Sequence, residues 1–440
     1  MDFLKVNIEQ EGKWMYALTE QLYPICRSIT GDGVRETLSI LNEFINISVT
    51  EVPTGTKVLD WEIPDEWNIR DAWIKDTKSK KIVDFKKHNL HVLNYSEPVA
   101  KKVNLKELKD HLYTMPGFPE WIPYRTSYYK RQWGFCLSYN QYKNLEDGEY
   151  EVFVDSDLQL GSLTYAECFI PGTSKNEVLI SCHICHPSLC NDNLSGIVIA
   201  VNMARLLSKT KPYYSYRFLF VPGTIGAITW LSKNEDKIGN IKHGLVLTLL
   251  GDSSPFHYKK SRQGNAEIDQ ILEYVLKNRK DSKILDYSPY GYDERQYCSP
   301  GFNLPVGSLS RKPFGEFPEY HTSADNLDFI NPLNLGESLN LLLDIIKVLE
   351  GNKTFINTNP KGEPQLGKRG LYDNVGGQSQ SKNYQMAILW ILNLSDGNNS
   401  LLDIAKKSGI EFEMLLSASE KLLEATLLRI TKNYLQKEVK

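Results

Sequence analysis

The chain has 440 residues, of which 41% are hydrophobic and 24% charged, and its formal net charge is -3. This length suggests roughly two or three domains, and the charge balance excludes the basic field typical of nucleic-acid-binding domains. The lack of an apolar run of about eighteen residues excludes a membrane helix, and the acidic N-terminal stretch and seven unpatterned cysteines favour a cytoplasmic protein.

Two amphipathic segments open the chain, at 15–22 and 34–44, separated by Thr30-Gly-Asp-Gly. From 56 to 153 the pattern changes to short alternating runs rich in Val, Tyr and Trp, broken by Pro and Gly. This alternating pattern is more typical of β-strands than of helices. We therefore expect a β-rich insert domain over 56–153, with strands at 72–75, 81–85, 90–95 and 150–154.

Apolar runs alternate with helical patterns between residues 160 and 350. This order predicts an α/β core with a mostly parallel sheet covered on both faces, built from residues 1–55 and 154–352. In such sheets, functional residues lie in loops beyond the carboxyl ends of the strands. The expected strands are 177–181, 216–221, 244–250 and 304–309, and the expected helices are 194–208, 224–236, 265–278 and 331–350.

The C-terminal part follows a linker at 353–379 that is rich in Gly, Pro, Asn and Ser. Helical patterns at 383–394, 400–408 and 411–427 predict a further domain over 380–440, and the last two have the spacing of a helix-turn-helix. From 383 onward, seven Lys and Arg balance seven Asp and Glu. This balance favours contact with proteins, including a homo-oligomer, over nucleic acid.

The strongest chemical signal follows the strand that ends near Cys182. His183, His186 and Asp192 fall within ten residues, and Ser195-Gly196 then leads into an apolar helix. Imidazole and carboxylate groups are the ligands of catalytic zinc, which typically has about three protein ligands and one water. Two other interpretations stay open: a structural Cys/His zinc site using Cys182, Cys185 and Cys190, and ordinary buried polar residues.

Two later loops carry further candidates. His321 lies among acidic residues and is the expected closing ligand, with Asp325 orienting its imidazole. Asp252, after strand 244–250, is placed either for a second metal or for a turn. In the loop at 292–301, Asp293 or Glu294 is the expected general base. The expected substrate-binding residues are Tyr292, Arg295, Arg262 and Arg311, although each charged group is equally a solvated surface charge.

The order of His183, Asp192 before Ser195-Gly196, and a late His321 resembles the di-zinc aminopeptidase superfamily, which includes glutaminyl cyclases. More narrowly, the phrase His183-Ile-Cys-His-Pro-Ser with Asn191-Asp-Asn-Leu-Ser-Gly resembles an aminopeptidase-like family of bacteria and archaea. The resemblance spans essentially the whole chain. It implies a zinc-exopeptidase-like fold with a small inserted domain, a C-terminal winged helix, and a connection with surface-polysaccharide biosynthesis.

One departure from the superfamily pattern changes the expected chemistry. The superfamily carries adjacent glutamates after the strand equivalent to 216–221, whereas this chain has Pro222-Gly223-Thr224 there. We therefore expect one Zn²⁺ rather than two, with His186 either replacing the lost ligand or orienting a neighbour. The expected function is hydrolysis of a small peptide, acyl-amide or amino-sugar substrate. The alternative is a non-peptidase hydrolase or ligand-binding protein in surface-polysaccharide biosynthesis.

Overall fold

The computed structural model describes residues 6–371 and 378–431. These residues form two compact units. The first runs to Leu341 apart from residues 270–275, and the second comprises residues 270–275 and the chain from Leu342 onward. No helix of the described residues is long and apolar enough to cross a membrane.

An eight-stranded sheet forms the centre of the first unit, in the order β1-β10-β12-β11-β13-β16-β14-β15. Strand β11 (Glu177–His183) is parallel to β12 (Ser215–Val221) and to β13 (Ile241–Leu247), and β16 (Val306–Ser310) is parallel to β13. Every residue of β11 and β12 is buried, as expected for central strands covered on both faces. The outer strands are β1 (Ser48–Pro53), β10 (Ser162–Ile170), β14 (His257–Lys259) and β15 (Lys283–Leu285).

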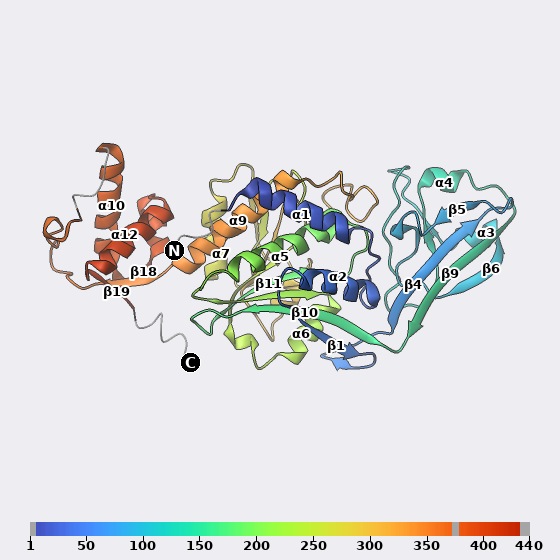
Figure 1. Cartoon of the computed structure of the whole chain (residues 1–440), viewed down its shortest axis with the longest axis horizontal. Coiled ribbons are helices and arrows are strands. Elements are labelled where there is room, and N and C mark those ends of the chain that lie inside the picture. The colour runs from blue at the N-terminus through green and yellow to red at the C-terminus, as the bar shows by residue number, and fades with distance from the viewer. Residues whose placement is uncertain (1–5, 372–377, 432–440) are drawn as a thin grey trace. The chain divides into compact units, whose positions relative to one another are not determined.

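Helices cover the sheet. In Figure 1, α1 and α5 lie on one side of the sheet and α6 on the other. Helix α5 is buried over nearly its whole length, which explains why its sequence is apolar on all sides. These positions confirm the predicted mostly parallel α/β core. The helices are α1 (Ile8–Leu22), α2 (Asp32–Asn42), α5 (Ser195–Leu207), α6 (Ile225–Lys233), η3 (Ile238–Asn240), α7 (Glu267–Leu276), α8 (Glu294–Tyr297) and α9 (Pro332–Gly351).

The β-rich insert leaves the core after β1 and returns at β10, two strands that pair antiparallel with Pro53 opposite Ser162. Its main sheet is antiparallel, in the order β5-β4-β9-β6. The elements of the insert are β2 (Lys57–Val58), β3 (Trp61–Glu62), β4 (Glu66–Lys75), β5 (Lys81–Asp84), η1 (Asn89–His91), β6 (Val99–Asn104), α3 (Leu105–Lys109), β7 (Leu112–Tyr113), β8 (Phe135–Cys136), α4 (Tyr139–Lys143) and β9 (Glu149–Gln159).

Two strand predictions need correction. Residues 90–95 do not form a strand: the side chain of His88 accepts a hydrogen bond from Leu90 N–H, and a short 3₁₀ helix follows. Beyond that turn, Val92 and Asn94 make isolated bridges. The strand expected at 244–250 is β13, Ile241–Leu247, because pairing with β11 extends the strand over the polar residues at its start.

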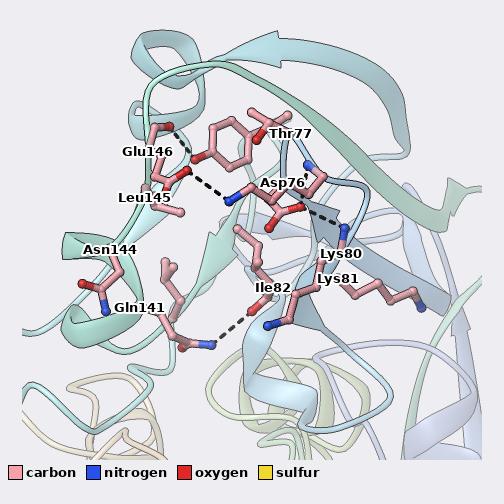
Figure 2. Close-up of a pocket in the computed structure, with 12 residues that line it drawn as sticks. Asp76, Thr77, Lys80, Lys81, Ile82, Gln141, Asn144, Leu145 and Glu146 are labelled. Carbon is pink, nitrogen blue, oxygen red and sulfur yellow. Dashed lines mark hydrogen bonds and ion pairs between the residues drawn. The ribbon is translucent and has the colours of Figure 1, made fainter.

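The insert also encloses a cavity of about 330 Å³ between the β4–β5 turn and α4, shown in Figure 2. Asp76 Oδ1 accepts hydrogen bonds from the backbone N–H groups of Lys78 and Lys80, each at 2.9 Å. Gln141 Nε2 donates to Ile82 O at 3.1 Å. These polar groups of the cavity wall are therefore bonded to one another.

The second unit contains a three-stranded sheet in the order β18-β17-β19 and three longer helices. Ser400 and Asp403 form a capping box at the start of α11, and Gly409 ends that helix in the left-handed conformation, with φ at 69°. The predicted helix-turn-helix is thus present. Within the linker predicted at 353–379, Thr354–Asn357 forms β17, the central strand of this sheet. Residues 372–377 of that linker and the charges from 432 onward lie outside the described residues. The elements are β17 (Thr354–Asn357), η4 (Gly367–Arg369), α10 (Gln378–Leu394), β18 (Asp396–Ser400), α11 (Leu401–Ser408), α12 (Phe412–Glu424) and β19 (Leu428–Ile430).

Candidate metal centre

Strand β11 ends at His183, and the chain then passes through a loop and a kinked turn, η2 (Cys190–Leu194), into α5. This path carries His186 and Asp192 back to the end of the strand. One ligand atom from each of His183, His186 and Asp192 lies within 4.8 Å of the others, so three side chains of types favoured by zinc meet at one point.

Asp192 is the centre of this group. His183 Nε2 lies 2.9 Å from Asp192 Oδ1, His186 Nδ1 lies 4.0 Å from the same oxygen, and His321 Nε2 lies 3.0 Å from Oδ2. The Asp192 side chain is fully buried, whereas that of His321 is 33% exposed. Access from solvent therefore lies on the side of His321.

The polar atoms at this point fit a metal ion. His186 Nδ1, Asp192 Oδ2 and His321 Nε2 are buried, and none of them makes a well-aligned hydrogen bond, although Asp192 Oδ2 and His321 Nε2 lie 3.0 Å apart. Buried polar atoms in proteins are nearly always bonded, so three such atoms at one point call for a shared partner. A divalent cation bound by imidazole and carboxylate groups supplies one.

The protonation states also suit metal binding, which requires neutral imidazole and ionised carboxylate. Burial holds the pKa of His186 well below its usual value, although Asp192 opposes this effect. Burial raises the pKa of Asp192, but the neighbouring His186, His183 and His321 outweigh that effect and hold this pKa well below its usual value.

The interleaved cysteines do not join this group. In the part of the chain that the structure describes, the residues grouped for metal binding are His183, His186 and Asp192, and no cysteine belongs to the group. Cys185 Sγ points instead to the carbonyl oxygen of Gly223, at 3.8 Å. The geometry therefore favours a His and Asp centre over a structural Cys/His zinc site.

Two buried acids hold the turn that carries Asp192. Asp325 accepts hydrogen bonds from the backbone N–H groups of Asn191 at 2.6 Å and Asp192 at 2.9 Å. Asp252 accepts from Asn191 Nδ2 at 2.8 Å and from Ser254 N–H at 2.6 Å, one bond to each carboxylate oxygen. Asp325 thus accepts hydrogen bonds from the backbone of the turn, whereas the sequence predicted that it orients the His321 imidazole. Asp252 accepts from the Asn191 side chain and the Ser254 backbone.

The loop that carries His321 is held by aromatic residues. His321 adopts a φ of 56°, which is uncommon for a residue other than glycine. Tyr124 N–H from the insert donates to His321 O at 2.7 Å, and the Tyr320 ring stacks on the His321 ring at 3.9 Å. Sequence reasoning missed Tyr124, because nothing in its local pattern links it to a residue almost two hundred positions away.

Asp293 approaches the turn after β12, Pro222-Gly223-Thr224, which carries no carboxylate of its own. A β-carbon on Gly223 would lie 3.1 Å from His183 Cβ and 3.7 Å from Asp293 Oδ1, so Asp293 occupies the space above Gly223. Asp293 is 1% exposed, and neither of its carboxylate oxygens has a hydrogen-bond partner. Burial raises the pKa of Asp293 to about 7, against the opposing effect of His183.

Tyr292 also reaches the centre. Its ring stacks on His183, with centroids 4.8 Å apart, and its hydroxyl group donates to Asp192 Oδ1 at 3.2 Å. Arg295 lies near Asp293 and lowers the pKa of that carboxyl group, while its buried Nε has no hydrogen-bond partner. The structure therefore brings Tyr292 and Asp293 to the candidate metal ligands, with Arg295 close to Asp293.

Three other predicted residues make their contacts elsewhere. Glu294 forms an ion pair with Lys259 in a neighbouring cavity. Arg262 bonds Asn303 Oδ1 at 2.9 Å in an exposed position. Arg311 is buried, and its guanidinium donates to Ser338 Oγ and Asn334 O, which gives it a structural role.

Arg27 is a further residue that the sequence did not reveal. It is fully buried between α1 and α2, and its Nε donates to His186 O at 2.9 Å. Its Nη1 donates to Leu22 O at 2.8 Å and to Thr37 Oγ1 at 3.3 Å. Arg27 thus fixes the loop that carries His186, yet it lies far from that loop in sequence.

Comparisons with known proteins agree with this architecture. A family model described as a domain of unknown function, DUF4910, matches residues 16–352, and a winged helix-turn-helix model matches residues 353–430. A Clostridium acetobutylicum protein is 52% identical over 425 residues, which cover 96% of this chain and 98% of that protein. It is named as a candidate polysaccharide biosynthesis protein with an aminopeptidase-like domain.

Solved structures extend the comparison. A structure of a C. acetobutylicum protein described as a candidate peptidase has a TM-score of 0.92 and 50% identity, covering 97% of this chain and 98% of its own. A zinc aminopeptidase from Bacillus subtilis has a TM-score of 0.57 and 11% identity, covering 77% of this chain and 95% of its own. The second likeness shows the fold alone. Together these matches confirm the predicted aminopeptidase-like fold and the winged helix.

Proposed function

Because this chain belongs to the DUF4910 family and carries a His and Asp cluster on an aminopeptidase-like fold, we propose that it is a zinc-dependent amide hydrolase that uses one metal ion. The observation that carries this proposal is the meeting of three buried polar atoms without well-aligned hydrogen bonds, one each from His186, Asp192 and His321. His183, His186, Asp192 and His321 would hold the ion. When bound, zinc polarises a carbonyl group and lowers the pKa of water to roughly 7.

A single ion is favoured by the residues that a second ion would need. The turn after β12, Pro222-Gly223-Thr224, carries no carboxylate. Each carboxylate oxygen of Asp252 already accepts a hydrogen bond, from Asn191 or from Ser254. Asp252 is also absent from the group that His183, His186 and Asp192 form among the described residues, so these residues favour one ion.

The residues around the cluster have matching roles in amide hydrolysis. Asp293, whose two carboxylate oxygens lack partners, accepts the proton of the attacking water and returns it to the leaving amine. Tyr292 keeps Asp192 and the His183 ring in place through its hydroxyl bond and its stacking contact. Arg295 places a positive charge beside Asp293, where it stabilises a developing oxyanion or a substrate carboxylate.

Metal analysis and substrate panels test this proposal on the full-length protein. We expect one equivalent of zinc per chain in the native protein, and hydrolysis of aminoacyl amides or N-acyl amides that requires zinc. His321→Ala should lose both the metal and the activity. Native protein without stoichiometric metal, together with an unaffected His321→Ala variant, would contradict the proposal.

The name of the C. acetobutylicum relative favours a second candidate function, action on a sugar-linked or acylated metabolite in polysaccharide assembly. The same cluster would then cleave an acyl group from an amino sugar, or only bind such a ligand. Hydrolysis of N-acylated amino sugars without hydrolysis of dipeptides would select this function over peptide cleavage.

A further inference from the structure

A cavity of about 320 Å³ lies beside the metal centre and shares the Tyr292 ring with it. Tyr292 also contacts His183 and Asp192, so a single side chain connects the wall of this cavity with the proposed ligands. The volume falls at the lower end of the range for small-molecule sites, which suits one small ring or side chain. The lining includes Thr248, His257, Lys259, Tyr290, Glu294 and Phe314.

A buried ion pair forms one wall of this cavity. Glu294 Oε1 pairs with Lys259 Nζ, and the same ammonium group donates to Ser288 O at 3.2 Å and to Tyr290 O at 2.9 Å. These contacts use the three protons of the ammonium group. A β-carbon at Gly291 would lie 2.0 Å from Glu294 Oε1, so a larger residue at this position would displace the ion pair.

The second carboxylate oxygen of Glu294 has no partner. Oε2 is buried without a hydrogen bond, and the Glu294 side chain is 1% exposed. Leaving a buried charged acceptor unbonded costs more free energy than the same omission at a neutral group. Glu294 lines the cavity, so a small shift of its side chain would let a molecule in the cavity donate a hydrogen bond to Oε2 and remove this cost. The insert cavity differs, because the polar groups of its wall noted above are bonded to one another.

The charges of Lys259 and Glu294 determine whether a cationic or a neutral donor group of a ligand fits beside Oε2. Lys259 already neutralises Glu294, and its ammonium group would repel a ligand ammonium group placed beside Oε2. The exposed Glu316 at the rim is solvated, so its charge is screened. A neutral hydroxyl donor therefore fits Oε2 better than a protonated amine.

Aromatic rings supply the other walls. The rings of Tyr290 and Phe314 lie 5.2 Å apart, and the rings of Tyr292 and Phe314 also lie 5.2 Å apart. Tyr290 is 71% exposed, which leaves its face open at the rim. Flat apolar faces next to a hydrogen-bond acceptor match a ring that has an apolar face and hydroxyl groups on its edge.

We propose that this cavity is the substrate pocket of the metal centre and that it holds a neutral, hydroxyl-bearing pyranose ring, with Glu294 determining specificity. The link to catalysis rests on the proposed function, whereas the sugar site itself does not. The amide or acyl group of such a sugar-linked substrate would extend past Tyr292 toward Asp192.

Direct binding measurements on full-length protein, with and without zinc, test this inference. The probes are methyl β-D-glucopyranoside and methyl N-acetyl-β-D-glucosaminide, and alanine amide is the cationic competitor. Calorimetry and saturation-transfer NMR measure the binding of each probe. We expect saturable pyranoside binding without zinc, about fivefold weaker in Glu294→Gln and in the exposed-ring variant Tyr290→Ala. Glu235→Gln, which changes an exposed glutamate elsewhere, should bind as the native protein does.

The outcomes separate this inference from the proposed function. Absence of saturable pyranoside binding, or tighter binding of alanine amide that Glu294→Gln weakens, would overturn the sugar site even if amides are hydrolysed. Pyranoside binding unchanged in both Glu294→Gln and Tyr290→Ala would also overturn it. Pyranoside binding that both variants weaken supports it even if no amide is cleaved, in which case only the hydrolase proposal fails.

Discussion

Replacing His321 with alanine should remove most of the stabilisation that zinc gives to the first unit. Zinc at about 100 times its Kd stabilises a folded protein by about 2.7 kcal/mol. The unit has about 330 described residues, so an unfolding entropy of about 2.1 cal/mol/K per residue gives roughly 0.7 kcal/mol/K. The expected rise in Tm is therefore about 4 °C. If losing one ligand weakens binding about 100-fold, the stabilisation falls to about 0.4 kcal/mol and the rise to less than about 1 °C.

Intrinsic tryptophan fluorescence can follow this unit selectively, because of the eight tryptophans only Trp390 belongs to the second unit. Melting curves are recorded with chelator and with zinc for the native protein and for His321→Ala. His88→Asn is the matched control, since it removes an imidazole from the insert and should keep the full zinc response. An equal rise in Tm for the native protein and His321→Ala would refute the role of His321 as a ligand.

Three other variants test separate parts of the structure. Arg27→Lys loses the bond to His186 O, so zinc affinity should fall about 10-fold in competition with a chromogenic chelator; an affinity within twofold of the native value would contradict this. Asp293→Asn should lower amide hydrolysis at least about 100-fold while zinc affinity stays within about threefold, and equal losses in both would place Asp293 among the ligands. Burial and His91 lower the pKa of His88 from 6.5 to about 4. The neutral ring therefore makes its full contribution to the free energy of unfolding above pH 6.5. This contribution is lost as the pH falls toward 4, by up to about 3 kcal/mol. His88→Asn keeps an acceptor for Leu90 N–H, so urea unfolding at pH 7 and 4.5 should show a smaller loss than in the native protein, and an equal loss would refute this.

Much of the fold was predictable because its signals are local. Continuous apolar runs identified β11 and β12, and the helical period located α5 and α9 within one or two residues. The missed segment at 90–95 shows the limit of this reasoning. Its alternating pattern is that of a strand, but the cap from His88 and contacts with distant residues turn the backbone instead.

The residues of the proposed site likewise include some that local sequence could predict and others that it could not. His183, His186 and Asp192 are close in sequence and follow a strand, so their meeting could be predicted from local spacing. Asp293 and Glu294 are adjacent, and the sequence could not separate them. The structure directs Asp293 toward Gly223 and Glu294 toward Lys259. Arg27 and Tyr124 carried no signal, because their contacts with the histidine loops exist only after the chain has folded.

The connection of the insert to the core has a consequence for how this family can vary. Pro53 and Ser162 are paired neighbours on adjacent antiparallel strands, a separation that a two-residue turn bridges, so the sheet places little constraint on what joins them. Yet Tyr124 N–H bonds His321 O, and Ile122 N–H bonds Ser323 Oγ at 2.9 Å. The sheet therefore permits the insert to change in length and sequence. A few residues of the insert nevertheless contact the loop that carries His321. Natural selection acting on the insert can therefore tune the proposed metal centre without changing any ligand.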